Sequence, residues 1–89
     1  MPTAAFVLQA RSRNDGGPVR VGFTVSRKVG SAVERNRVRR RLREMVRLAS
    51  GLADGHDYVL IGRRAALLRR FDEMTEDFKR ALRRARIPK

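Results

Sequence analysis

The chain has 89 residues, of which 22 are Lys or Arg and only 9 are Asp or Glu, so its formal net charge is +13. A chain of this length forms a single domain with a thin core, and so large a positive charge calls for a polyanionic partner. The absence of cysteine excludes disulfides, thiolate nucleophiles and Cys-ligated zinc, and the absence of a signal peptide or membrane-length apolar run predicts a soluble intracellular protein.

Two strands are predicted near the N-terminus. Residues 4–10 are apolar and lead into the turn-forming residues 14–18, which is typical of a strand that enters a loop. In residues 19–26 apolar side chains alternate with polar or small ones, so one set faces the core and the other faces an accessible surface. We expect the two strands to pair as an antiparallel hairpin.

A long basic helix is predicted after Gly30. Ser31 and Glu34 match a capping box, in which two side chains satisfy free amides at a helix N-terminus. Over residues 32–49 the apolar positions recur with the helical period and form one stripe, made of Val38, Leu42, Met45, Val46 and Ala49. The opposite side carries Asn36, Arg40, Arg43 and Arg47. Gly51 can end the helix in a left-handed cap.

The rest of the chain predicts a third strand and a second helix. The run YVLI at 58–61 has no polar alternation, as expected for a strand that is central in the sheet and covered on both faces. Residues 63–70 are a loop or a short helix, and residues 71–86 form an amphipathic helix whose acidic start and basic end complement its dipole. The predicted order is β-β-α-β-α, a single α+β domain over residues 1–89.

Positive charge is concentrated on the first helix. Residues 27–47 contain nine basic residues and two acidic ones, and arginines four residues apart repel each other on a free helix. A solvated helix face is the usual explanation of a charge run, but this imbalance favours an anionic partner. Asn36 carries no charge, so it indicates a directed hydrogen bond or a metal-bound water, although an exposed polar filler explains it nearly as well.

The segment FTVSRKVGSAVERNRVRRRLRE, residues 23–44, resembles the signature of the bacterial ribonuclease P protein family, in which a basic helix carries an Arg-Asn-Arg core. The resemblance continues through DYVLIGR at 57–63 and the last helix. It implies a small mixed sheet in which the basic helix makes an unusual left-handed crossover between parallel strands. Relatives usually begin with a further N-terminal helix whose aromatic residues wall a substrate cleft. This sequence starts at the first predicted strand, so we expect that helix to be absent here.

The resemblance also implies which residues act. The residues that would bind RNA are Lys28, Arg35, Asn36, Arg37, Arg39, Arg40, Arg43 and Arg47. A cleft between helix and sheet would receive the single-stranded 5′ leader of precursor tRNA, and the residues lining it would be Val7, Gln9, Thr24, Ser26 and Arg27. Gln9 stands where many relatives have an aromatic residue, so hydrogen bonds would replace base stacking there. Asn36 would reach a metal ion only through water.

The family further implies that the chain is the accessory subunit of a ribonucleoprotein endoribonuclease, ribonuclease P, which matures the 5′ ends of tRNA. Its partners would be ribonuclease P RNA and precursor tRNA, with no membrane partner. The RNA would hold Mg²⁺ and perform the hydrolysis, so the protein alone would be inactive. We expect a monomer within the ribonucleoprotein, in the bacterial cytoplasm.

Two other functions remain open. A general nucleic-acid module, such as a ribosomal protein or a DNA-binding helix, would share the basic helix but would not need the Arg-Asn-Arg core. A polybasic peripheral membrane protein would need an apolar helix face that is free to insert into lipid, but here the core requires the apolar face of the basic helix. A protein enzyme acting alone has too few groups, since His56 is the only histidine and residues 27–31 lack the spacing of a P-loop.

Overall fold

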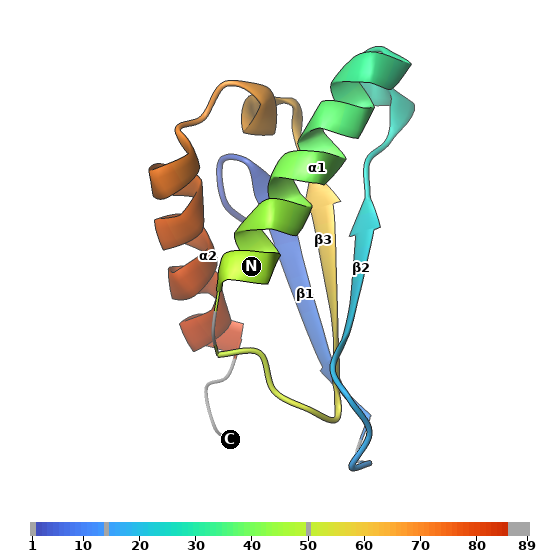
Figure 1. The fold of residues 1–89 in the computed structure, drawn as a ribbon, viewed down its shortest axis with the longest axis vertical. Coiled ribbons are helices and arrows are strands. Elements are labelled where there is room, and N and C mark those ends of the chain that lie inside the picture. Colours follow the sequence, from blue (N-terminus) through green and yellow to red (C-terminus); the bar gives the residue numbers. More distant parts are fainter. Residues whose placement is uncertain (1, 14, 50, 86–89) are drawn as a thin grey trace.

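The structure, a computed structural model, describes residues 2–13, 15–49 and 51–85. The strands are β1 (Phe6–Ser12), β2 (Arg20–Thr24) and β3 (His56–Gly62), and the helices are α1 (Ala32–Leu48) and α2 (Phe71–Ala85). Short 3-10 turns span Arg27–Val29 and Arg64–Leu67. The α+β class and the element order β-β-α-β-α are therefore confirmed (Figure 1).

The strand order in the sheet is β1-β3-β2, with β3 antiparallel to β1 and parallel to β2. The central place of β3 is confirmed, but the predicted hairpin between the first two strands is wrong, because each of them pairs with β3 instead. The expectation that both faces of β3 are covered is also wrong. Tyr58 and Leu60 are buried, whereas Val59 and Ile61 on the other face are partly exposed.

Helix α1 connects the parallel strands β2 and β3. In Figure 1 both strands point upward, α1 lies in front of the sheet, and β3 lies to the left of β2. A connection that crosses the front of a sheet toward the left is left-handed, which is the rare sense for such a unit. The handedness that the resemblance implied is therefore confirmed.

Helix α1 begins at its predicted capping box. Ser31 Oγ accepts a hydrogen bond from the Glu34 N–H at 3.2 Å, and Glu34 Oε1 accepts one from the Ser31 N–H at 2.9 Å. The helix ends at Leu48 because Ala49 is already extended, with φ −87° and ψ 155°. Gly51 has a positive φ of 99°, but it lies beyond this extended residue, so the predicted left-handed cap is not what ends the helix.

Both helices pack on one face of the sheet and leave the other face uncovered. Alternate residues at the start of β1 and along β3 point into this core, where Phe6, Leu8, Tyr58 and Leu60 are at most 1% exposed. The rings of Phe6 and Phe78 meet edge to face with centroids 6.0 Å apart, which joins β1 to α2. No helix in the described ranges is long and apolar enough to cross a membrane.

A glycine of β3 lets α1 approach the sheet closely. A Cβ at Gly62 would come 2.7 Å from Val38 Cγ1 and 3.3 Å from Leu42 Cδ1, both of which are on the apolar side of α1. That side is fully packed, since Val38, Leu42 and Met45 have no exposed surface. The sheet therefore fixes which side of α1 faces solvent.

Candidate nucleic-acid interface

The solvent side of α1 carries the predicted basic face. Asn36, Arg40, Arg43 and Arg47 are all exposed. On the opposite side Val38, Leu42 and Met45 are buried, and Val46 and Ala49 are partly buried against the core. The helical period that placed charge on one side and core residues on the other is therefore confirmed. An anionic ligand can bind this face only through cations that are not already paired with other groups of the protein.

Several of these side chains already have partners. Arg35 Nη1 donates to the Gly30 carbonyl oxygen at 2.9 Å, and Arg39 Nη1 donates to Asn36 Oδ1 at 3.2 Å. Arg47 Nε donates to Glu44 Oε1 at 3.1 Å. This hydrogen bond to Arg47 holds the pKa of the Glu44 carboxyl below its usual range.

Other cations of the same surface have no anionic partner in the described part of the chain. Lys28, Arg37 and Arg40 are exposed and form no ion pair with any described residue. Arg43 lies over the Phe23 ring, with its guanidinium carbon 5.7 Å from the ring centroid. A cation–π contact leaves the guanidinium N–H groups able to donate, so these four side chains can bind phosphate oxygens.

The start of α1 is tied to the turn after β3. Arg64 Nη1 donates to the Val29 carbonyl oxygen at 2.6 Å, and Arg64 Nη2 lies 3.1 Å from Glu34 Oε2. The hydrogen bond from Arg64, together with the Ser31 N–H, holds the pKa of the Glu34 carboxyl below its usual range. A Cβ at Gly30 would come 2.7 Å from Arg64 Nη1 and still closer to Glu34 Oε1, so a larger residue there would displace both side chains from this contact.

Of the five residues assigned to a leader cleft, Val7, Gln9 and Thr24 lie on the uncovered side of the sheet. Val7, Ile61 and Thr24 form one row of side chains across β1, β3 and β2. Gln9, Val59 and Gly22 form the next row, and Ser26 and Arg27 follow β2 as exposed residues. The space between α1 and the sheet is filled by the apolar core, so this candidate surface is the uncovered sheet face instead of a cleft beneath the helix.

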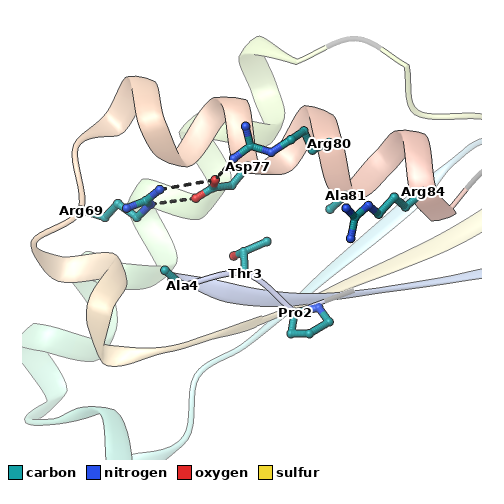
Figure 2. Close-up of a pocket in the computed structure, with 8 residues that line it drawn as sticks. All are labelled: Pro2, Thr3, Ala4, Arg69, Asp77, Arg80, Ala81 and Arg84. Atoms are coloured by element: carbon teal, nitrogen blue, oxygen red, sulfur yellow. Dashed lines mark hydrogen bonds and ion pairs between the residues drawn. The ribbon is translucent and has the colours of Figure 1, made fainter.

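Three ion pairs with a buried or half-buried partner were not predicted from the sequence. Asp77, assigned only to the dipole of the last helix, is 6% exposed and binds Arg69 Nε at 2.7 Å and Arg80 Nη2 at 2.5 Å (Figure 2). Arg13 Nη1 binds Asp57 Oδ1 at 2.6 Å across 44 residues. Arg80 lies three residues after Asp77 on α2, at a helical spacing, whereas Arg69 and Arg13 contact their partners from outside the partner's element, which no sequence period signals.

The described residues do not form a metal cage of their own. No group of three or more His, Cys, Asp or Glu side chains in these ranges is arranged to hold a metal ion. Asn36 Oδ1 accepts from Arg39 and stands among cations, so a metal ion near it would need anionic ligands from elsewhere. Asn36 and its neighbours therefore fit contact with a water that is bound to a metal ion held by a partner, and they do not fit direct coordination of the metal.

Known proteins resemble the whole chain. The family model described as Ribonuclease P matches residues 1–86. A curated relative named ribonuclease P protein component, from Gluconacetobacter diazotrophicus, is 48% identical over 89 residues, which cover 98% of this chain and 77% of the relative. A relative of the same name from Ruegeria pomeroyi is 50% identical over 92 residues, covering 96% of this chain and 72% of the relative.

Solved structures share the fold. The RNase P protein from Thermotoga maritima is 28% identical with a TM-score of 0.77, and the match covers 100% of this chain and 83% of that one. The Staphylococcus aureus RNase P protein is 24% identical with a TM-score of 0.77, covering 98% and 80%; this second likeness concerns the fold alone. The chain therefore belongs to the ribonuclease P protein family, whose members are protein subunits of the ribonucleoprotein endoribonuclease that matures the 5′ end of tRNA.

Proposed function

We propose that the chain binds ribonuclease P RNA through the basic face of α1 and binds the 5′ leader of precursor tRNA on the uncovered face of the sheet. The observation that carries this proposal is the set of exposed cations on α1 and on the turn before it, of which Arg37, Arg40 and Lys28 lack an anionic partner among the described residues. Phosphate oxygens would supply those partners and release counterions.

The uncovered sheet face has the chemistry of a single-strand platform without aromatic residues. Thr24 and Gln9 offer a hydroxyl and an amide to nucleotide edges, and the partly exposed Val7 and Ile61 offer apolar surface between them. Single-stranded RNA is usually held by stacking on aromatic side chains. This face therefore depends on hydrogen bonds and apolar contact, and Arg27 in the turn after β2 adds a cation for the backbone.

The protein would act on the chemistry only through RNA. In this proposal Mg²⁺, held by RNA phosphates, supplies the Lewis acidity and the activated water of phosphodiester hydrolysis. The cations of α1 reduce the repulsion between RNA phosphates, so that less Mg²⁺ is needed for the folded complex. Asn36 would orient a water or a nucleotide near the metal, and the protein alone would not cut.

The proposed working form is one protein chain per RNA in the bacterial cytoplasm, where precursor tRNA is made. The described core is closed by the two helices on one side, and the large positive charge disfavours self-association without RNA. Sedimentation of the reconstituted complex would measure this stoichiometry, and a ratio of two proteins per RNA would contradict it.

The decisive experiment is cleavage of precursor tRNA at limiting Mg²⁺ with the RNA alone and with the protein added. We expect cleavage only with RNA present, and faster cleavage when the protein is added. Gln9→Ala and Thr24→Ala should weaken binding of a substrate with a long leader and leave a substrate with a one-nucleotide leader unchanged. Equal effects on both substrates would contradict the leader assignment, and no stimulation by the protein would favour a general nucleic-acid module.

A further inference from the structure

A second basic site lies between α2 and the segment that precedes β1. It is a pocket of about 220 Å³, and its charged lining consists of Arg69, Asp77, Arg80 and Arg84 (Figure 2). Pro2 and Ala4 form part of the opposite wall. The three guanidinium groups outnumber the one carboxylate, so the pocket is positively charged. None of its residues belongs to α1 or to the uncovered sheet face.

The buried carboxylate of Asp77 holds two of the arginines in place. Its oxygens lie 2.7 Å from Arg69 Nε and 2.5 Å from Arg80 Nη2. Because Asp77 is neutralised by these contacts, it does not exclude an anion from the pocket. Arg80 uses only Nη2 in this pair, so its Nε and Nη1 groups remain able to donate to a ligand.

Among the described arginines that line the site, Arg84 is the one without a partner. It forms no hydrogen bond or ion pair with any residue in the described ranges, and in Figure 2 its guanidinium points from α2 toward the segment that carries Pro2. Arg80 and Arg84 are four residues apart on α2, where like charges repel. An anion between them would remove this repulsion and supply the missing acceptor.

The opposite wall is held in position without a ligand. Thr3 Oγ1 accepts hydrogen bonds from the N–H groups of Ala5 at 3.3 Å and Phe6 at 3.1 Å. Arg63 Nη1 donates to the Thr3 carbonyl oxygen at 3.2 Å. The Thr3 segment, Arg69 and Arg80 are therefore held by contacts that a ligand does not have to create, which lowers the entropic cost of binding, and only the Arg84 side chain is left for the ligand to order.

We propose that this pocket binds a phosphate group of an RNA backbone, with Arg84 as the main donor and Arg80 as the second. The planar guanidinium fork matches two phosphate oxygens, and Pro2 and Ala4 provide apolar surface for the adjoining ribose. The pocket gives the chain a second RNA contact besides the basic face of α1. This inference rests on RNA binding by the chain, and the phosphate could belong either to ribonuclease P RNA or to precursor tRNA.

The neighbouring Arg83 provides a matched control, because it is exposed, carries the same charge in the same helical turn and does not line the pocket. Arg84→Glu should weaken RNA binding by about tenfold, and Arg83→Glu by about threefold or less. Binding to ribonuclease P RNA alone and binding of precursor tRNA to the reconstituted complex distinguish the two sources of phosphate. Equal losses for Arg83→Glu and Arg84→Glu in both assays would overturn the proposal.

A second measurement maps the contact directly. The chain has no cysteine, so Ala4→Cys places a single thiol at the pocket wall for an iron–EDTA tether. We expect strand cleavage at one discrete RNA segment, which Arg84→Glu in the same chain abolishes. Cleavage that survives Arg84→Glu would overturn the phosphate contact. If Arg40→Ala weakens RNA binding but Arg84→Glu does not, this inference fails while the proposed function stands.

Discussion

The guanidinium carbon of Arg43 lies 5.7 Å from the centroid of the Phe23 ring, so one residue of the basic α1 face packs against the edge strand β2. A cation over an aromatic face at an exposed site gains about 0.5–1 kcal/mol. Arg40, on the same face, has no such contact and no ion pair among the described residues. The two arginines therefore combine the same charge with different structural roles.

Truncation of these two arginines should separate RNA binding from stability. Arg40→Ala should change the free energy of unfolding by less than about 0.5 kcal/mol, and Arg43→Ala should reduce it by about 0.5–1 kcal/mol through loss of the Phe23 contact. Each should weaken RNA binding and lower the log-log salt slope by about one, from a wild-type slope of roughly −3 to −5. Unfolding of both variants with unchanged RNA affinity would refute the assignment of the two faces.

Leu42→Ala should have the opposite effect. Leu42 is fully buried, and its truncation should cost about 2–4 kcal/mol of stability, because a cavity is left beneath α1. Leu48→Ala is the control on the same helix, since Leu48 is 58% exposed. Chemical denaturation measures both, and under conditions where Leu42→Ala is folded its salt slope for RNA binding should equal that of the wild type.

The elements of the fold were predictable from the sequence, but the pairing of its strands was not. The capping box of Ser31 and Glu34 and the stripe of Val38 and Leu42 depend on residues three or four apart, so local periodicity reveals them. A hairpin of the first two strands and a central third strand exclude each other in a three-stranded sheet, and only the second is correct. The apolar YVLI run pointed to the correct central place of the third strand, although the reason given for it, cover on both faces, does not hold at Val59 and Ile61.

The candidate site shows the same division between local and long-range contacts. The basic face of α1 followed from helical spacing, whereas the contact of Arg69 with Asp77 joins a turn to a helix and had no local signal. The contact of Arg13 with Asp57 spans 44 residues. Such pairs form only after the chain has folded, so charge patterning cannot reveal them.

Removal of the charge at Asp77 should loosen α2 from the turn before it. Asp77→Asn removes the negative charge and replaces one of the two acceptor oxygens by an NH2 group that faces the guanidinium donors of Arg69 and Arg80. We expect a loss of about 1–3 kcal/mol, moderated because both guanidinium groups are partly exposed. Asp72→Asn is the control, since Asp72 pairs with Arg70 at the surface and should cost less than about 1 kcal/mol. Equal losses in urea denaturation would show that burial of Asp77 does not matter.

Glu34 should make stability depend on pH. Its pKa is lowered in the folded state, first by the hydrogen bond from Arg64 and then by the Ser31 N–H. A lowered carboxyl pKa means that the stabilisation is fully present above the pKa of the unfolded chain and is lost as the pH falls through the folded pKa. Glu34→Gln should therefore be less stable than the wild type at neutral pH and approach it in acid.

Denaturation from pH 7 to pH 2.5 measures this difference. Ser31→Ala serves as the control, because the Ser31 hydroxyl caps the helix without carrying charge. Loss of this hydroxyl should cost about 1 kcal/mol of stability both above and below the pH at which Glu34 titrates. A constant difference between wild type and Glu34→Gln across the whole range would mean that the Arg64 and Ser31 contacts do not depend on the carboxylate charge.

Asn36 gives the test of the proposed role near the metal. Asn36→Ala removes no charge and lies on the solvent side of α1, so it should change stability by less than about 0.5 kcal/mol and leave the salt slope unaltered. If its amide orients a metal-bound water or a nucleotide, cleavage of precursor tRNA should fall at limiting Mg²⁺ and recover when Mg²⁺ is raised. Full activity at limiting Mg²⁺ would make Asn36 a surface filler.

The hydrogen bond that Asn36 accepts from Arg39 sets the control for this experiment. A loss of cleavage in Asn36→Ala has a second possible cause, because Arg39 loses its acceptor at 3.2 Å and can move away from a phosphate. Arg39→Lys keeps the positive charge but loses the guanidinium fork, so it disrupts this pair without touching the Asn36 amide. We expect Arg39→Lys to weaken RNA binding at every Mg²⁺ concentration, whereas Asn36→Ala alone should shift the Mg²⁺ dependence of cleavage. If the two variants shift that dependence equally, Asn36 acts by positioning Arg39 and not through a metal-bound water.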